Sequence, residues 1–309
     1  MIWKRPLVIV LAVAVFLLNP PNSSGAEQDS DRVEENARVY SLVYTPVYQF
    51  KTDLDGGGTF DVRRHYFRFG AFQRLDPQWS VGLDVSYDYE NWNFSDVDDI
   101  VGTDLWNTIH RPGIGIALNR AFSTQWRLGI VPSVEFSGAS GADLDEALTY
   151  GAVASLSHAF SRDLVLGIGA GVFDRLEETD AFPFLVIDWQ ITPSFRLTNP
   201  LRAGPAGPAG LELVYTPDGM WSFGIGGAYR SYRFRLDDRS AVANGVGEVE
   251  FLATFAKAAC RFGPRIRLAL FAGAFFDGDI SIEDDRGNKL GTTAYDTAPF
   301  VAVSITGRF

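Results

Sequence analysis

The amino-acid sequence predicts an all-β fold in which a single antiparallel transmembrane β-barrel of about 14 strands is formed. Three observations favour this fold. From residue 38 onward, apolar and polar residues alternate, as in strands with one apolar and one polar face. The connections between these runs are short and long in turn, as in membrane barrels. The chain also ends in an alternating strand.

The last strand shows the alternation clearly. One face holds the apolar residues Val301, Val303, Ile305 and Phe309, and the other holds Ala302, Ser304, Thr306 and Arg308. Because side chains alternate across a strand, we expect the first face to meet lipid and the second to face a lumen.

The first 26 residues have the pattern of a cleaved signal peptide. Lys4 and Arg5 precede an apolar run at residues 7–18, and small residues at 24–26 suit a signal peptidase. The run is too short to cross about 30 Å of hydrocarbon as a helix. We therefore expect a signal peptide at residues 1–26, a periplasmic lead-in at 27–37 and the barrel at 38–309. A retained membrane anchor is the alternative.

Composition excludes some classes of partner. The net charge of −11 argues against nucleic acid, because nucleic-acid-binding surfaces are basic. The one cysteine, Cys260, cannot form an internal disulfide, and we interpret it as a packing residue. The mean hydropathy of +0.01 is compatible with a membrane barrel, because the two faces of each strand cancel in the average.

The connections set the strand number. Six short ones lie near residues 75–78, 121–124, 161–163, 192–194, 216–219 and 261–264, and contain residues that favour tight turns. Seven long ones lie near residues 51–60, 95–105, 138–148, 175–181, 200–209, 237–246 and 277–293. An even strand number puts both termini at the same end of the barrel as the short turns. In bacterial barrels this end is periplasmic, and the long loops face the cell exterior. If residues 195–217 do not pair, the barrel has 12 strands. A soluble β-sandwich is the alternative fold.

The tryptophans follow the connections. Trp79, Trp126, Trp189 and Trp221 each lie beside a short turn, as an aromatic girdle at a membrane interface would. Trp92 and Trp106 flank a long loop and are candidates for an outer girdle.

The polar strand faces carry charges that define a candidate lumen wall. Counting from the turn at 75–78 puts Arg64 across from Asp88 and Arg68 across from Asp84. Counting from the turn at 121–124 puts Arg111 across from Glu135, with Arg127 on the same face. Such a wall could select permeating solutes. Alternatively, its charges form structural ion pairs inside a filled barrel. Gly151, Ser155, Ser157, Gly167, Gly169 and Gly171 would form a facing wall of small residues.

Two further clusters are weaker candidates. If Tyr232, Phe234 and Leu236 face lipid, Arg233 and Arg235 point inward near the outer rim and could hold an anion or a lipopolysaccharide phosphate. The alternative is pairing with Asp237, Asp238 or other loop acids. Acidic residues near 277–285 match no trustworthy calcium spacing, and residues 284–288 favour a hairpin tip.

Enzymatic chemistry finds little support. The three histidines, His65, His110 and His158, all fall on outward faces by the same alternation. We find no Ser/His/Asp arrangement, phosphate loop or metal-ligand spacing. We therefore predict no enzyme, no cofactor and no metal site.

Residues 230–238, residues 293–300 and the terminal Phe309 resemble an uncharacterised, porin-like family of bacterial outer-membrane β-barrel proteins. The resemblance implies an outer-membrane location and contact with lipid and lipopolysaccharide. It also implies recognition by the barrel assembly machinery through Val303, Ile305, Gly307 and Phe309. A passive channel or binding barrel for small solutes is the expected function. A closed barrel that works through its long loops, and an outer-membrane hydrolase, are the alternatives.

Overall fold

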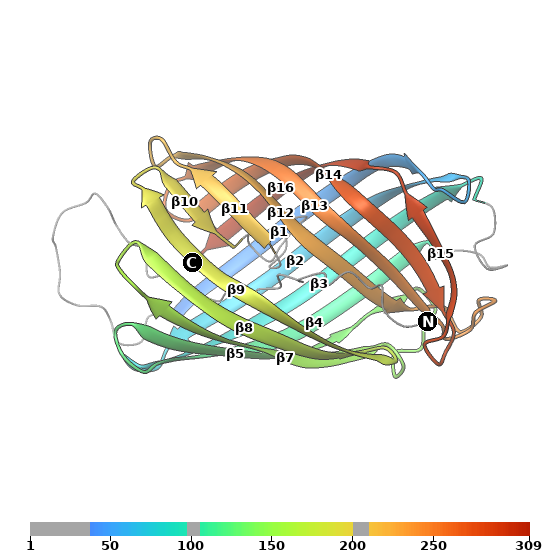
Figure 1. The fold of residues 1–309 in the computed structure, drawn as a ribbon, viewed down its shortest axis with the longest axis horizontal. Coiled ribbons are helices and arrows are strands. Elements are labelled where there is room, and N and C mark those ends of the chain that lie inside the picture. Colours follow the sequence, from blue (N-terminus) through green and yellow to red (C-terminus); the bar gives the residue numbers. More distant parts are fainter. Residues whose placement is uncertain (1–37, 98–105, 200–209) are drawn as a thin grey trace, which may run out of the picture.

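The computed structural model of the chain describes residues 38–97, 106–199 and 210–309. These residues form one closed antiparallel β-barrel (Figure 1). No helix in these three ranges is long and apolar enough to cross a membrane. The predicted signal peptide and lead-in lie outside the described residues, as do most of the Gly- and Pro-rich residues 204–210.

Fourteen strands make up the barrel wall, and the all-β prediction is confirmed. The wall strands are β1 (Arg38–Asp53), β2 (Thr59–Arg74), β3 (Trp79–Ser95), β4 (Thr108–Ala121), β5 (Trp126–Phe136), β7 (Leu148–Ala159), β8 (Leu164–Arg175), β9 (Glu178–Thr192), β10 (Phe195–Thr198), β11 (Gly210–Tyr215), β12 (Trp221–Arg235), β13 (Val246–Phe262), β14 (Ile266–Glu283) and β16 (Ala298–Arg308). Two short strands, β6 (Gly138–Ala139) and β15 (Lys289–Tyr295), lie at the long-loop end. The uncertain pair β10 and β11 does form, so the 12-strand alternative is wrong.

Several short turns share one local structure. In each of them, the side chain of one Asp or Ser accepts hydrogen bonds from the backbone N–H groups two and three residues later. Asp76 accepts at 2.7 and 2.7 Å, Ser123 at 3.1 and 3.1 Å, and Asp218 at 3.0 and 2.8 Å. Asp and Ser are favoured in turns because of such bonds. These polar residues therefore end the strands at the short-turn end.

The predicted registers are wrong by two residues. Arg64 pairs with Glu90 instead of Asp88, and Arg68 pairs with Ser86 instead of Asp84. Likewise, Glu135 lies across from Gly113 instead of Arg111. The cause is turn size: the backbone N–H of Leu75 bonds the carbonyl of Trp79 at 3.0 Å, which moves the centre of the hairpin by one residue. A shift of two preserves the inward and outward faces.

The outer surface is apolar, and the tryptophans beside the short turns face outward as predicted. Trp79, Trp126, Trp189 and Trp221 all point outward and are 39–44% exposed.

One predicted long connection, at 175–181, is instead a two-residue turn, because Leu176 and Glu177 both adopt positive φ angles, of 49° and 67°.

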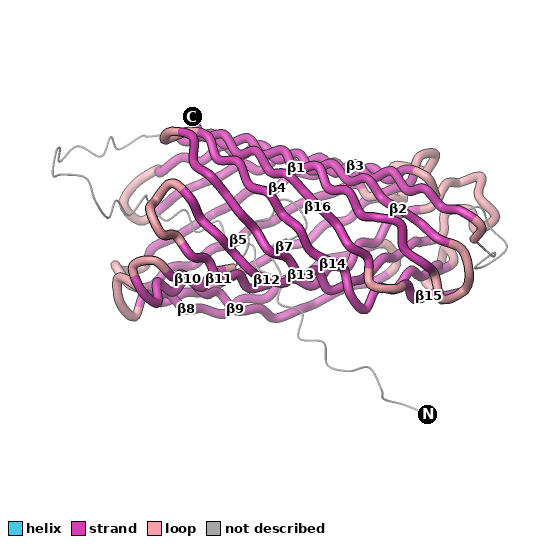
Figure 2. Tube along the Cα trace, turned by 90° about the horizontal axis from the view of Figure 1, so that it is seen from above, coloured by secondary structure: helices cyan, strands magenta, loops and turns pink. Residues whose placement is uncertain are grey.

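The long-loop end of the barrel closes upon itself. Strand β6 pairs with β4 on one side and with β12 on the other. At this end β6 therefore links β4 directly to β12, without the strands β5 to β11 that separate them in the barrel wall. Inside this narrowed end lies a cluster of buried apolar side chains from β1–β4, β6 and β12–β16. Trp92 and Trp106 belong to it and are 2% and 6% exposed, so their assignment to an outer girdle is wrong. The strands of this end run side by side in Figure 2.

Elsewhere in the lumen, aromatic rings lie over glycines. Phe173, Phe182 and Phe184 each sit directly across the ladder from a glycine of the neighbouring strand: Gly151, Gly171 and Gly169. A Cβ at any of these glycines would meet the ring. Each of these rings therefore lies against the ladder of the neighbouring strand.

Candidate solute-binding cavity

A cavity of about 260 Å³ lies in the lumen beside the apolar cluster. Its walls differ in chemistry. Strands β2, β3 and β5 contribute polar groups, including Arg68, Asp88 and Glu135, whereas β8 and β9 contribute Phe173 and Phe182. The two rings are parallel within 2°, with centroids 6.0 Å apart. The arrangement provides both an apolar and a polar surface for a small molecule.

Most of the predicted charged wall forms buried ion pairs. Arg68 binds Asp88 through both guanidinium nitrogens. Glu90, which the sequence places on the lumen face but which was left out of the predicted charged wall, lies between Arg64, at 3.6 Å, and Arg111. All three of these side chains are at most 2% exposed. Glu90 follows the inward parity of Asp84 and Asp88, so alternation alone could have identified it.

The neighbours of Arg64 are aromatic as well as acidic. Its guanidinium carbon lies 5.3 Å from the Trp92 ring and 5.4 Å from the Phe275 ring, and it donates a 2.8 Å hydrogen bond to Gln49. Cation–π contacts of this kind gain strength when water is excluded. The ion pair is therefore part of the packed long-loop end and does not face a water-filled path.

Glu135 differs from the other predicted acids. Its carboxylate lines the cavity, and within the described parts of the chain no hydrogen bond or ion pair within 4.0 Å engages it. Tyr66 and Tyr232 line the same space. Asp84 also lines the cavity, but it has a partner. A ligand in the cavity would thus find an acceptor that the protein leaves available.

Arg233 and Arg235 point in the direction opposite to the predicted one. Phe234 is 0% exposed within the apolar cluster, and Tyr232 packs against that cluster. The two arginines lie on the other face of β12. The prediction assumed that the apolar face meets lipid, but at the closed end it meets the core. Parity counted from the outward Trp221 would have placed both arginines correctly.

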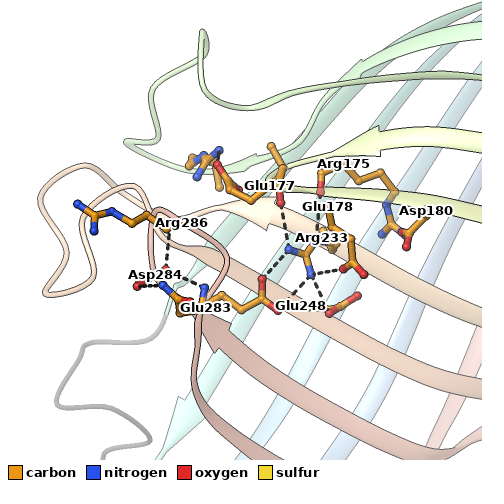
Figure 3. Close-up of polar contacts among 12 residues, drawn as sticks. Arg175, Glu177, Glu178, Asp180, Arg233, Glu248, Glu283, Asp284 and Arg286 are labelled. Carbon is orange, nitrogen blue, oxygen red and sulfur yellow. Dashed lines mark hydrogen bonds and ion pairs between the residues drawn. The ribbon is translucent and has the colours of Figure 1, made fainter. Parts of the chain in front are cut away.

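Both guanidinium groups are engaged by protein acceptors, and Figure 3 shows those around Arg233. Arg233 pairs with Glu248 at 3.0 Å, Glu283 at 2.6 Å and Glu178 at 3.3 Å. It also bonds the backbone carbonyls of Arg175 and Leu176 at 3.2 and 3.0 Å. These contacts hold the β8–β9 turn against β12–β14. They favour an ion-pair role at the rim over the anion site that the sequence suggested.

Arg235 completes this contact. It pairs with Glu177 at 2.7 Å and donates to the carbonyls of Glu146 and Asn244 at 2.8 and 2.6 Å. The loop acids Asp237 and Asp238 pair with Arg239 instead.

The remaining predicted residues lie as follows. Arg127 points inward near the short turns, on the face opposite the exposed Trp126. Val303 and Ile305 belong to β16, which closes the barrel between β1 and β14. The backbone of Phe309 exchanges two 2.9 Å hydrogen bonds with Tyr40. Ring nitrogens of His65 and His110 lie 2.8 Å from the Tyr44 and Tyr87 hydroxyls on the outer surface. In the described ranges, no group of three or more His, Cys, Asp or Glu residues could hold a metal.

Comparison with known proteins gives a likeness of architecture. No family model matches the chain, and no curated protein matches it. Among solved structures, an outer membrane channel from Pseudomonas putida F1 is similar, with 9% identity, a TM-score of 0.47, and coverage of 91% of this chain and 100% of that chain. The P. putida toluene transporter TodX has 8% identity, a TM-score of 0.44, and coverage of 88% and 90%. The translocator domain of autotransporter NalP from Neisseria meningitidis has 10% identity, a TM-score of 0.35, and coverage of 90% and 90%. Such low similarity says nothing of the ligand.

Proposed function

We propose that this chain is an outer-membrane β-barrel that binds a small solute in its mid-lumen cavity. The apolar outer face, the tryptophan girdle and the closed strand order support placement in a membrane. The resemblance noted from the sequence supports the outer membrane in particular. In this setting, lipid would contact the outer face, and the assembly machinery would read the C-terminal strand that ends at Phe309.

The observation that carries the binding proposal is the Glu135 side chain, which lines the same cavity as two phenylalanine rings and has no hydrogen-bond or ion-pair partner among the described residues. A carboxylate accepts hydrogen bonds, and the Phe173 and Phe182 rings favour an apolar body. An apolar cavity of about 150 Å³ holds benzene, so a cavity of about 260 Å³ has room for one or two rings. We therefore propose a solute with a ring-sized apolar part and an amine or hydroxyl group that donates to Glu135.

The filled long-loop end favours a second candidate, the closed barrel that works through its loops. The buried cluster occupies the lumen where an axial pore would have to pass. In that case the cavity is a packing defect, and the chain conducts nothing.

Two measurements on the purified, folded barrel separate these candidates. The first is single-channel conductance in a planar bilayer. The second is equilibrium dialysis with labelled tyramine, which carries a ring and an amine, with protein-free micelles as the blank. We expect saturable tyramine binding that Glu135→Gln weakens about tenfold, since hydrogen bonds to charged groups contribute roughly 1.5–3 kcal/mol.

The matched control is Asp174→Asn, which neutralises an acid on the outer surface that bonds the Tyr150 hydroxyl at 3.0 Å. It should leave tyramine binding unchanged. Binding without conductance would assign a binding barrel, whereas ohmic steps would add passage. A folded barrel that neither binds nor conducts would contradict the proposal and leave the closed structural barrel.

A further inference from the structure

At the short-turn end, two arginines face each other across a ladder. Arg261 of β13 and Arg267 of β14 are direct partners in the register. Their neighbours Phe262 and Ile266 point outward and are 57% and 48% exposed. Because side chains alternate, both arginines point into the lumen. Like charges directly opposite on a ladder destabilise the pair, so this arrangement costs stability unless something offsets it.

A third arginine joins them from the next strand. Arg308 of β16 lies on the face opposite the outward Ile305 and the 67% exposed Phe309, and its backbone N–H bonds the carbonyl of Arg265 at 2.8 Å. The positive charges of Arg261 and Arg308 both act on Arg267. Three guanidinium groups thus gather at one side of the inner mouth.

The protein supplies little counter-charge there. Among described residues, no carboxylate lies within 4.0 Å of Arg261, Arg267 or Arg308, and Arg267 donates only to the Ser222 hydroxyl, at 2.8 Å. Glu212 acts on Arg267 more strongly than either neighbouring arginine does, but it is shared with Lys257, with which it forms an ion pair. Even with a carboxylate at Phe309 counted, the cluster keeps a positive excess. The mid-lumen arginines differ, because each of them has an acidic partner.

We infer that Arg261, Arg267 and Arg308 form a binding site for anions that carry several carboxylate or phosphate groups. Guanidinium groups bind both in bidentate geometry, and an anion between them would relieve their mutual repulsion. This inference does not depend on the cavity or on its solute.

Such carboxylates have two available sources. One is a free anion that enters from the short-turn side. The other is the chain itself, since residues 27–36 contain five acidic residues and one arginine. That stretch directly precedes β1, whose Ser41 pairs with Arg308 in the ladder.

Calorimetric titration with citrate at low ionic strength tests the site. Arg267→Gln should weaken citrate binding about tenfold or more, as expected for the loss of a charge-assisted bidentate contact. Arg261→Gln, at the exposed rim, provides a second variant in case Arg267→Gln folds poorly. It should also raise the thermal midpoint in anion-free buffer, because it removes the like-charge pair.

The matched control is Arg120→Gln at the same end of the barrel. Arg120 points outward, with its guanidinium carbon 5.0 Å from the Trp79 ring and 5.1 Å from the Phe122 ring, so citrate binding should not change. Two outcomes would overturn the inference. One is equal citrate affinity in the unaltered chain and in both variants, Arg261→Gln and Arg267→Gln. The other is that neither the unaltered chain nor a chain lacking residues 27–36 binds citrate. Deletion of these residues identifies the source: a rise in affinity means that they occupy the site, and no change means a free anion.

Discussion

The two sides of the barrel use phenylalanine for opposite purposes. In β13, β14 and β16, inward rings contact one another. The ring centroid of Phe275 lies 4.4 Å from that of Phe251 and 4.4 Å from that of Phe300. In β8 and β9, inward rings lie against glycines across the ladder. The first side therefore fills the lumen, and the second side leaves the cavity next to it. Rings of the filled side also lie across the ladder from glycines, as Phe300 does from Gly273 and Phe234 from Gly247. The difference is therefore the further rings that stack on them, and not the glycine partner.

The largest effect is expected from the buried charges. Glu90→Ala leaves Arg64 and Arg111 without their shared carboxylate in a region at most 2% exposed. Breaking a buried pair in this way costs about 3–5 kcal/mol. Urea unfolding of the barrel in lipid vesicles measures this loss. Glu135→Gln should cost far less, because Glu135 faces the cavity without a partner. Equal losses would mean that the cavity wall is as tightly packed as the filled side.

The next effect concerns the rings themselves. Phe300→Ala removes a ring that is 1% exposed, and we expect a loss of about 3 kcal/mol or more in the free energy of unfolding. Phe182→Ala removes a ring that borders the cavity, so less packing is lost. The same urea titration compares the two variants. A larger loss for Phe182→Ala would reverse the proposed contrast between the sides.

A smaller effect concerns the glycines of β8 alone. Gly169→Ala places a methyl group against the Phe184 ring and should destabilise the barrel by about 1–3 kcal/mol. The double variant Gly169→Ala/Phe184→Leu should recover part of this loss, because the ring is one of two obstacles and the other, the Ala154 carbonyl oxygen, remains. Additive losses in the double-mutant cycle would show that the ring and the glycine do not depend on each other.

The smallest effect is local and depends on pH. At the β14–β15 hairpin tip, Asp284 accepts hydrogen bonds from the Asn288 side chain at 2.9 Å and from the backbone N–H groups of Asn288 and Arg286 at 2.8 and 2.9 Å. These bonds lower the pKa of Asp284 below its usual value. The stabilisation is therefore present above the unfolded-state pKa and is lost as pH falls through the lower folded-state pKa.

Hydrogen exchange of the Arg286 and Asn288 amides should follow this change. Protection should fall on acidification in the unaltered chain. In Asp284→Asn, the protection should be weaker and independent of acidification. Protection that falls with acid equally in both chains would assign the effect to another group.

Much of the architecture could be predicted from alternation and turn residues. A period of two places Arg64, Arg111 and Glu135 in the lumen whatever the exact register, because a two-residue error preserves the face. The turn residues similarly determine where the wall strands end, and so their number. The pairing partners required more, because the size of each turn moves the whole ladder.

The closed long-loop end was decided only by tertiary structure. Parity counted from the outward Trp221 places Phe234 on the lumen face, but alternation does not say whether the lumen at this end is open or packed. Pairing of β6 with both β4 and β12 joins these strands at the long-loop end, where Phe234, Trp92 and Trp106 meet in one cluster. The sequence alone thus determined a 14-stranded barrel with a charged interior. Which part of that interior is packed and which part is hollow depended on contacts between residues far apart in the chain, since local periodicity carries no information about distant partners.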